Sequence, residues 1–327
     1  MPSRPLVAIL CLQDSPHAEA AAEIECGIIG EAAQVRTFAL PERPLPGDFP
    51  PAVLGAAALI IWHSLPVDAA LIARLSACRA LIRNGVGVDS VDLQAAAARG
   101  LPVCNVPDYG TEEVADHALA LTLALCRQLF ALDAEAKRLG WRIEVAGRLR
   151  RLGSLTFGVV GLGRIGTAAA LRAKAFGFRV LFFDPYVPPG THKAVGVERV
   201  ASLADLLARS DVVSLHCPLT PETRGFIGAG ELALMKPTAH LVNTARGDLV
   251  QKAPLLAALR AGRLGGAGLD VVEQEPLRTA EEAATPNLIV TCHAAFCSVE
   301  GLVEMRSTSA RIARAAVLGL PVWNRVN

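Results

Sequence analysis

Short apolar runs alternate with longer alanine-rich stretches along most of the chain. Apolar runs bounded by polar residues or glycine are typical of buried parallel strands, and the stretches between them have helical spacing. The alternation therefore predicts an α/β protein with parallel sheets. In the first hundred residues we expect strands over residues 6–12, 34–39, 58–62, 81–83 and 102–104, with helices over 18–30 and 68–78.

A long helix is expected over residues 111–131, with Thr111 as its N-cap and two glutamates in its first turn. The last helix, over residues 299–318, is amphipathic and is expected to return to the first domain, which makes that domain discontinuous. Between them lies a second α/β unit with the six strands of a complete dinucleotide-binding domain. We expect these strands over residues 156–160, 179–183, 212–216, 239–243, 266–269 and 288–291.

Length and charge limit the classes of protein. A chain of 327 residues exceeds the size at which one core usually stops growing, so two domains are expected. The formal net charge is +1 and no run of Lys and Arg tracks a phosphate backbone, which argues against nucleic acid as a partner. The longest nearly uncharged run, residues 50–66, is too short and too broken by proline to span a bilayer, so no membrane is expected either.

The eight cysteines include no Cys-x-x-Cys pair. We interpret them as small core residues in a reducing cytoplasm, and we expect neither a disulfide framework nor a metal site. The apolar run at residues 6–12 is followed at once by Gln13 and Asp14 and lacks a small-residue cleavage site, which favours a buried strand over a signal peptide.

A glycine-rich loop, Gly161-Leu-Gly-Arg-Ile-Gly166, stands between a predicted strand and a predicted helix. This arrangement lets the backbone approach a pyrophosphate, and the helix N-terminus presents free N–H groups to the anion. Asp184 closes the next strand, where a carboxylate accepts hydrogen bonds from ribose hydroxyls, so NAD is expected rather than NADP. The loop residues expected at the cofactor are Gly161, Leu162, Gly163, Arg164, Ile165 and Gly166.

Three residues that suit hydride transfer follow three successive strands. Arg246 comes after residues 239–243, Glu275 after 266–269, and His293 after 288–291. Because the carboxyl ends of parallel strands share one edge of a sheet, we expect these side chains to gather beside the glycine loop. Each residue alone is more often structural, but their coincidence favours a catalytic site. His117, His216 and His240 lie inside predicted elements and are assigned to the structural class.

The chemistry assigns each of the three a role. Reduction of a carbonyl needs a hydride, which a nicotinamide supplies, and a proton for the oxygen. An imidazole gains and loses a proton near neutral pH, so His293 is the expected acid. Glu275 orients its ring and favours its charged form. Arg246 binds the substrate carboxylate or carbonyl oxygen through forked hydrogen bonds.

Taken together, these motifs resemble the D-isomer-specific 2-hydroxyacid dehydrogenases over most of the chain. The resemblance also includes Asn84-Gly-Val-Gly-Val-Asp89, Asn105-Val-Pro107, Glu113-Val-Ala-Asp116, His216-Cys-Pro-Leu-Thr220, Asn243-Thr-Ala-Arg-Gly247, Glu275-Pro276 and His293-Ala-Ala295. It implies two Rossmann-like domains, a discontinuous flavodoxin-like substrate domain of residues 1–104 plus 296–327 and an NAD-binding domain of residues 105–295. It also implies a homodimer formed through the cofactor domains.

The resemblance implies further site residues. The glycine loop of the first domain offers Val86 and Gly87 to the substrate carboxylate, with Val86 also near the cofactor. Arg83 fits the branch similar to C-terminal-binding proteins and contacts the substrate, as Arg246 and His293 do. The other residues implied at the cofactor are Cys217, Pro218, Thr223, Thr244, Ala245, Arg246, Asp270, His293 and Phe296.

Three positions are expected to affect which substrate the site accepts. Cys292 stands where the family usually has proline, which is expected to loosen the turn. Phe296 replaces a tryptophan of the C-terminal-binding-protein branch, so the substrate is expected to differ in shape. Glutamate at position 275 argues against formate oxidation.

The expected function is hydride transfer between NAD(H) and C2 of a small 2-oxo or D-2-hydroxy acid. Glyoxylate, hydroxypyruvate, pyruvate and longer 2-oxo acids all remain candidates. Two alternatives stay open: an NAD(H)-sensing regulatory protein of the corepressor type, and a phosphite-type dehydrogenase that uses the same three residues.

Overall fold

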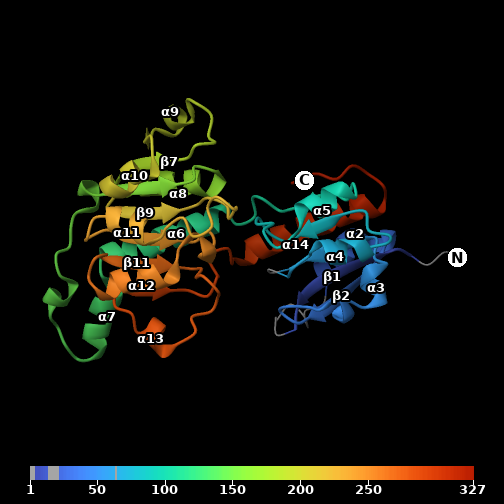
Figure 1. Cartoon of the computed structure of the whole chain (residues 1–327), viewed down its shortest axis with the longest axis horizontal. Helices are drawn as coiled ribbons and strands as arrows, with labels where there is room; N and C mark the ends of the chain where they lie inside the picture. Colours follow the sequence, from blue (N-terminus) through green and yellow to red (C-terminus); the bar gives the residue numbers. More distant parts are fainter. Residues whose placement is uncertain (1–3, 14–21, 63–64) are drawn as a thin grey trace. The chain divides into compact units, whose positions relative to one another are not determined.

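The computed structural model describes residues 4–13, 22–62 and 65–327. The chain divides into two compact units, Met1–Tyr109 with Ser298–Asn327, and Gly110–Cys297 (Figure 1). The first unit therefore contains both ends of the chain. Its boundaries lie at residues 109 and 298, beside the expected ones at 104 and 296.

The first unit is built on a five-stranded parallel sheet with the order β2-β1-β3-β4-β5. This is the flavodoxin-like order, in which the sheet is wound in both directions from its first strand. Every predicted strand of this sheet is present, each within one residue at either end. The strands are β1 (Leu6–Leu12), β2 (Gln34–Leu40), β3 (Ala58–Ile61), β4 (Leu81–Arg83) and β5 (Val103–Cys104).

The last long helix belongs to this first sheet. It is α14 (Val299–Val317), which packs against α2 (Glu23–Ile29), β3 and β4, as its amphipathic pattern predicts. The helix expected over 18–30 begins at Glu23, and residues 18–21 of that prediction lie outside the described residues. The unit also contains α3 (Pro51–Leu54), α4 (Ala69–Arg74), α5 (Leu93–Ala98) and the 3-10 turns η1 (Gly30–Ala32) and η2 (Pro46–Asp48).

The second unit has a seven-stranded parallel sheet with the order β12-β11-β10-β9-β6-β7-β8, the Rossmann arrangement with one further strand. The expected number of six is wrong because β8 (Glu198–Arg199) carries no apolar run: it is a two-residue edge strand of charged side chains. The others are β6 (Thr156–Val160), β7 (Arg179–Phe183), β9 (Val212–Leu215), β10 (His240–Asn243), β11 (Gly266–Leu269) and β12 (Leu288–Val290).

The long helix expected over 111–131 is two helices. Helix α6 (Thr111–Cys126) is capped by Gly110, so Thr111 is not the N-cap and its hydroxyl is buried with no hydrogen-bond partner among the described residues. Gln128 takes a left-handed backbone with φ +52° and separates α6 from α7 (Leu129–Lys137). No single described helix is long and apolar enough to cross a membrane, and this pair passes that test only with a 61° bend.

Six further helices belong to this unit in the described chain: α8 (Arg164–Ala175), α9 (Thr191–Val195), α10 (Leu203–Arg209), α11 (Ala229–Leu234), α12 (Lys252–Arg260) and α13 (Ala280–Ala283). It also contains the 3-10 turns η3 (Ile143–Ala146) and η4 (Leu152–Ser154) before β6, and η5 (Gly247–Leu249) after β10. Helix α6 packs on β10, β11 and α8. It comes so close to β11 that a Cβ at Gly268 meets Leu121 at 3.0 Å, which explains the small residues of that strand.

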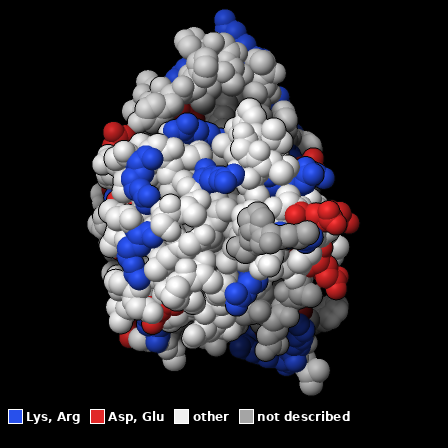
Figure 2. Space-filling model, turned by 90° about the vertical axis from the view of Figure 1, so that its right-hand side faces the viewer, with Lys and Arg blue, Asp and Glu red and all other residues white. Residues whose placement is uncertain are grey.

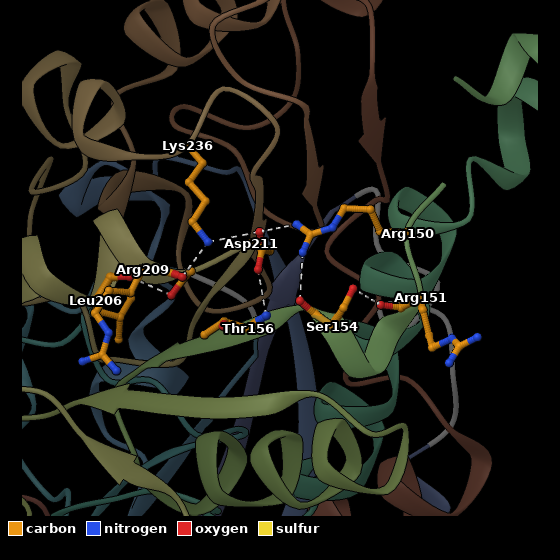
Figure 3. Close-up of polar contacts among 9 residues, drawn as sticks. Arg150, Arg151, Ser154, Thr156, Leu206, Arg209, Asp211 and Lys236 are labelled. Atoms are coloured by element: carbon orange, nitrogen blue, oxygen red, sulfur yellow. Dashed lines mark hydrogen bonds and ion pairs between the residues drawn. The ribbon is translucent and has the colours of Figure 1, made fainter. Parts of the chain in front are cut away.

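Charged side chains are interspersed with uncharged ones on the face of the molecule shown in Figure 2, where Lys and Arg residues are separated by uncharged surface. A different arrangement occurs inside the second unit, where one buried carboxylate accepts hydrogen bonds from three segments of the chain (Figure 3). Asp211, directly before β9, accepts hydrogen bonds from Arg150 (2.8 Å), Lys236 (3.1 Å) and the Thr156 N–H at the start of β6 (2.9 Å). Burial alone raises the pKa of Asp211, but these donors outweigh it and hold the pKa below its ordinary value.

Asp211 is therefore expected to make folding pH-dependent. Because its pKa is lowered in the folded state, its contribution is present above the unfolded pKa of about 3.9 and disappears as the pH falls through the folded pKa. We predict that Asp211→Asn lowers the free energy of unfolding at pH 7 by about 1–3 kcal/mol. The difference in this free energy between the variant and the unmodified protein is expected to shrink on acidification. Urea unfolding followed by circular dichroism between pH 7 and 3 measures this. Asp133→Asn, at an exposed pair with Lys137, is the control, and a gap independent of pH contradicts the prediction.

Candidate active site

The three glycines of the loop after β6 meet three different demands. Gly161 has φ +91°, and a Cβ there lies 2.8 Å from the Cys217 N atom, so the turn requires glycine. A Cβ at Gly166 lies 2.0 Å from the Gly161 carbonyl oxygen, so glycine lets α8 pack against the strand end. A Cβ at Gly163 meets nothing within 4 Å. The space over Gly163 lies beside the N-terminus of α8 and suits a pyrophosphate. Its oxygens can accept hydrogen bonds from the free N–H groups at the start of the helix.

Asp184 follows β7 and touches this loop. One carboxylate oxygen accepts the Leu162 N–H at 2.9 Å, and the other accepts the Tyr186 N–H at 2.9 Å. Each oxygen keeps a lone pair for a ribose hydroxyl. Beside it lies a cavity of about 310 Å³, lined by Phe183, Asp184, Pro185, Arg199, Val200 and Ala201.

Arg199 was missed at this position because the strand that carries it, β8, has no sequence signal. Its guanidinium donates to the Asp184 carbonyl oxygen at 2.9 Å and lies 5.9 Å from the centre of the Phe182 ring. Arg199 lies fifteen residues beyond Asp184 in the sequence, so the residues next to Asp184 give no sign of it. In the structure the guanidinium already has an acceptor there.

The three predicted catalytic residues all lie at the carboxyl edge of the second sheet. Arg246 lies three residues beyond β10, where Asn243 Nδ2 donates to the Arg246 carbonyl oxygen at 2.8 Å. The chain then passes so close to the segment after β11 that a Cβ at Gly247 lies 2.0 Å from the Val272 carbonyl oxygen. Glycine at position 247 thus fixes where Arg246 leaves the sheet.

His293 and Glu275 form a direct pair. His293 Nδ1 lies 3.0 Å from Glu275 Oε2, and both side chains are about two-fifths exposed, at 40% and 41%. Because Nδ1 faces the carboxylate, Nε2 is the ring atom available to a reacting group. The Phe296 ring stands edge-on to the imidazole at 6.4 Å between ring centres. The pair therefore has the geometry that general acid catalysis requires.

The turn that carries His293 is held by Asp270, which is 1% exposed. One Asp270 oxygen accepts the Ala294 N–H (2.9 Å) and the Thr291 hydroxyl (2.5 Å), and the other accepts the Ala295 N–H (2.9 Å). His293 itself has φ +53°, a conformation that costs energy for a residue with a side chain. These hydrogen bonds fix the turn that follows Cys292.

His117 was assigned to the structural class, and it supports this same turn. Its Nε2 lies 2.9 Å from the Thr291 hydroxyl and 3.7 Å from the Asp270 carboxylate. A histidine inside a helix carries no signal of such a role, because its partners lie on a strand end far along the chain. Thr291 was likewise not singled out from the sequence.

His216 and His240, also assigned to the structural class, are both kept neutral by burial. Burial lowers the pKa of His216 to about 4, and its Nε2 lies 2.9 Å from the Ser214 hydroxyl. Burial also lowers the pKa of His240, at the start of β10, to about 4, although Asp211 opposes this shift. Neither imidazole carries a charge at neutral pH, which agrees with their assignment.

The other residues expected at the cofactor follow β9 and β10. The thiol of Cys217 is neutral because burial raises its pKa to about 12. Thr223 Oγ1 donates to the Pro218 carbonyl oxygen at 2.7 Å and shapes the loop after β9. Thr244, followed by Ala245, has a buried hydroxyl with no hydrogen-bond partner among the described residues. An unpaired buried hydroxyl at this edge fits a polar group of a bound ligand.

The first-unit residues expected at the substrate carboxylate lie at the end of β4 and directly after it. Gly85 has φ +144°, and the Arg83 guanidinium folds over it to contact the Asn84 carbonyl oxygen. Val86 is exposed and Gly87 half-buried. We call residues 84–87 the 84–87 loop.

The contrast between Gly163 and Gly166 gives a matched test of the nucleotide site. We predict that Gly163→Ala weakens NADH binding about tenfold or more, since its methyl group occupies the space over the loop, while the thermal midpoint changes by less than about 2 °C. Gly166→Ala is the counterpart: its Cβ collides with backbone, so the midpoint falls by about 4 °C or more. Fluorescence titration with NADH and thermal unfolding measure both. Unchanged NADH affinity in Gly163→Ala sinks the assignment.

Comparison with known proteins agrees with this geometry. Residues 119–295, more than half of the chain, match the model of the D-isomer specific 2-hydroxyacid dehydrogenase NAD binding domain. The chain is 39% identical over 299 residues to D-3-phosphoglycerate dehydrogenase of Mycobacterium bovis, covering 91% of this chain and 56% of the relative. The chain thus spans about half the length of the curated relatives it matches.

Two solved structures have the same fold. The TT0316 protein of Thermus thermophilus superposes with a TM-score of 0.82 at 35% identity, covering 99% of this chain and all of that one. D-lactate dehydrogenase of Aquifex aeolicus, solved with NAD and lactic acid, has a TM-score of 0.84 at 28% identity and covers 96% of both chains. The similarity to C-terminal-binding proteins within the family stays a prediction. With the family model matched over the unit that carries the glycine loop, the chain belongs to the D-isomer specific 2-hydroxyacid dehydrogenases, and its cofactor is NAD.

Proposed function

We propose that this protein reduces a small 2-oxo acid to a D-2-hydroxy acid, with His293 as the proton donor. The observation that carries the proposal is the His293–Glu275 pair, 3.0 Å apart, at the same sheet edge as Arg246 and the nucleotide loop. Relatives support the class of substrate: one structure similar to this chain is a D-lactate dehydrogenase bound to lactic acid, and another is a glyoxylate reductase from Paecilomyes thermophila.

The residues of the second unit divide the work. Bound NADH supplies the hydride. The 161–166 loop and the N-terminus of α8 hold the pyrophosphate. Asp184 accepts hydrogen bonds from the ribose hydroxyls. Arg246 binds the substrate oxygens, and its positive charge stabilises the negative charge that develops on the carbonyl oxygen.

His293 delivers the proton from Nε2, because Nδ1 is held by Glu275. Glu275 fixes the orientation of the ring. In the reverse direction the same Nε2 accepts the hydroxyl proton. Asp270, Thr291 and His117 hold the turn and touch neither reacting group in this scheme, so they are positioning residues.

In this proposal, residues of the first unit bind the substrate carboxylate. Arg83 brings a positive charge, and Val86 and Gly87 bring backbone N–H groups in the 84–87 loop. Gly85 supports this assignment, since its positive φ turns the loop backbone sharply after β4. A carboxylate held by an arginine and backbone N–H groups is bound without excluding a range of side chains, which fits a family with several small 2-oxo acid substrates.

The proton donor is tested by His293→Gln, which keeps a polar side chain but cannot donate a proton as an acid. We predict a fall in the rate of 2-oxo acid reduction of about 10²–10⁴-fold with nearly unchanged NADH affinity. Glu275→Gln is predicted to lower the rate as well, because the ring loses the carboxylate that holds Nδ1 and orients Nε2. Stopped-flow NADH oxidation on glyoxylate, hydroxypyruvate and pyruvate measures both.

The same assay separates this proposal from its alternatives. An unmodified protein that binds NADH but reduces none of these acids points to a sensing role, and oxidation of phosphite points to a phosphite-type dehydrogenase. Near-normal turnover in His293→Gln, with the chemical step limiting the rate, ends the proposed mechanism.

We also propose that the protein is a homodimer through its cofactor unit. Large apolar side chains gather on α7 and the segment that follows it, and they are exposed in the single chain: Leu129 52%, Phe130 60%, Leu139 97%, Trp141 91% and Ile143 76%. Several large apolar side chains exposed together within fifteen residues are typical of a protein interface.

A substitution that introduces one charge tests this interface. Trp141→Asp is predicted to convert a dimer into a monomer in analytical ultracentrifugation, because it places a carboxylate in the apolar contact. Leu45→Asp, at a side chain 69% exposed in the first unit, is the control and is expected to stay dimeric. A monomeric unmodified protein at micromolar concentration refutes the proposal.

A further inference from the structure

A buried polar group lies directly behind the 84–87 loop. Asn84 is 2% exposed although it starts the loop that faces the substrate in the proposed function. Its carboxamide oxygen accepts from Trp62 Nε1 at 3.1 Å, and its amide nitrogen donates to the Ser309 hydroxyl at 2.6 Å and to the Met305 carbonyl oxygen at 3.2 Å. The Asn84 backbone N–H also donates to the Ile61 carbonyl oxygen at 2.8 Å. Every polar group of Asn84 named here is thus bonded to β3, to the residue after it, or to α14.

Helix α14 is itself fixed at this point. Arg306, between Met305 and Ser309, makes two hydrogen bonds to the Glu25 carboxylate, at 2.8 and 2.6 Å. Glu25 is 1% exposed and lies on α2, so this paired contact sets the position of α14 against the neighbouring helix. Ser309 is fully buried. The Arg306–Glu25 ion pair thus ties α14 to α2 within one turn of Ser309.

The far side of the loop is held in the same way. Asn105 Nδ2 donates to the Val86 carbonyl oxygen at 2.7 Å. Asn105 in turn donates its backbone N–H to the Asn324 carbonyl oxygen at 3.1 Å, in the segment after α14 that makes an antiparallel bridge between Cys104 and Arg325. Residues beyond position 298 thus support both ends of the loop.

We infer that the Asn84 carboxamide, fixed by Trp62, Met305 and Ser309, is a positioning group that sets the N–H groups of the 84–87 loop for the substrate carboxylate. Backbone N–H groups bind a carboxylate well only at hydrogen-bond distance and in line, and a displacement of one ångström loses much of the interaction. Isolated glycines give the loop no rigidity of its own. The rigidity comes from α14, through a side chain that itself does not touch the substrate. This inference rests on the proposed function, because the reaction gives the loop its ligand.

The test is Ser309→Ala, which removes one acceptor of the Asn84 amide and changes the volume least. The expected result is a KM for the 2-oxo acid raised about fivefold or more, with kcat and the dissociation constant of NADH changed less than about twofold, since the loop binds ground state and transition state alike. Ser307→Ala, on the same helix and outside this network, is the matched control and is expected to leave KM unchanged. A general loss of structure moves all three quantities, whereas loss of positioning moves KM alone.

A double-mutant cycle tests whether Ser309 acts through Asn84. If it does, Asn84→Ala combined with Ser309→Ala raises KM no more than Asn84→Ala alone, and simple addition of the two effects overturns the inference. Trp62→Phe keeps an aromatic ring and removes the donor to Asn84, so it gives a second route if Ser309→Ala does not fold. It too is expected to raise KM. An unmodified protein without turnover sinks the proposed function. Normal turnover with an unchanged KM in both Ser309→Ala and Trp62→Phe sinks this inference alone.

Discussion

The buried carboxylate of Asp270 holds together the edge of the sheet where the proposed chemistry takes place. A carboxylate with almost no exposure is costly unless its oxygens are fully hydrogen-bonded, and Asp270 accepts from Thr291, Ala294 and Ala295. Those bonds stabilise the left-handed backbone of His293, which then points its Nδ1 at Glu275. The same hydrogen bonds thus offset both the cost of burying the charge and the cost of the strained turn. In the proposed mechanism, the histidine that donates the proton is held in place by an acid that takes no part in the proton transfer.

The same edge depends on segments of backbone that pass unusually close together. Gly161, Gly166 and Gly247 each stand where a Cβ collides with a backbone atom of another turn at 2.8 Å or less. Close approach brings the end of β6 against the end of β9, and the segment after β10 against the segment after β11. It also leaves Gly163 as the one residue of the loop's three glycines with open space over it. Packing therefore shapes the 161–166 loop, and the N-terminus of α8 makes this site favourable for an anion.

Each unit holds a loop that meets ligand in the proposed function through buried polar side chains behind it. In the second unit Asp270 fixes the turn with His293, and in the first unit Asn84 fixes the 84–87 loop. Both supports are far more buried than the residues that would meet ligand: Asp270 is 1% exposed and Asn84 2%, whereas His293 is 40% exposed. Buried hydrogen bonds are strong and specific because no water competes with them. A loop held this way keeps its geometry while its outer surface stays open to substrate.

The sequence by itself determined the strands, the nucleotide loop and the three residues at its edge. Buried parallel strands need apolar runs, glycines are needed where the chain turns under a pyrophosphate, and the carboxyl ends of parallel strands share one edge, so local pattern was enough to place Arg246, Glu275 and His293. It failed where an element has no pattern, as at the charged two-residue strand that brings Arg199 to Asp184. Only the tertiary structure decided the supports: His117 bonds Thr291 across 174 positions, and Ser309 bonds Asn84 across 225. A polar residue inside a helix has the same local signature whether it is solvated or holds a distant loop, because its partner is chosen by packing and not by spacing along the chain.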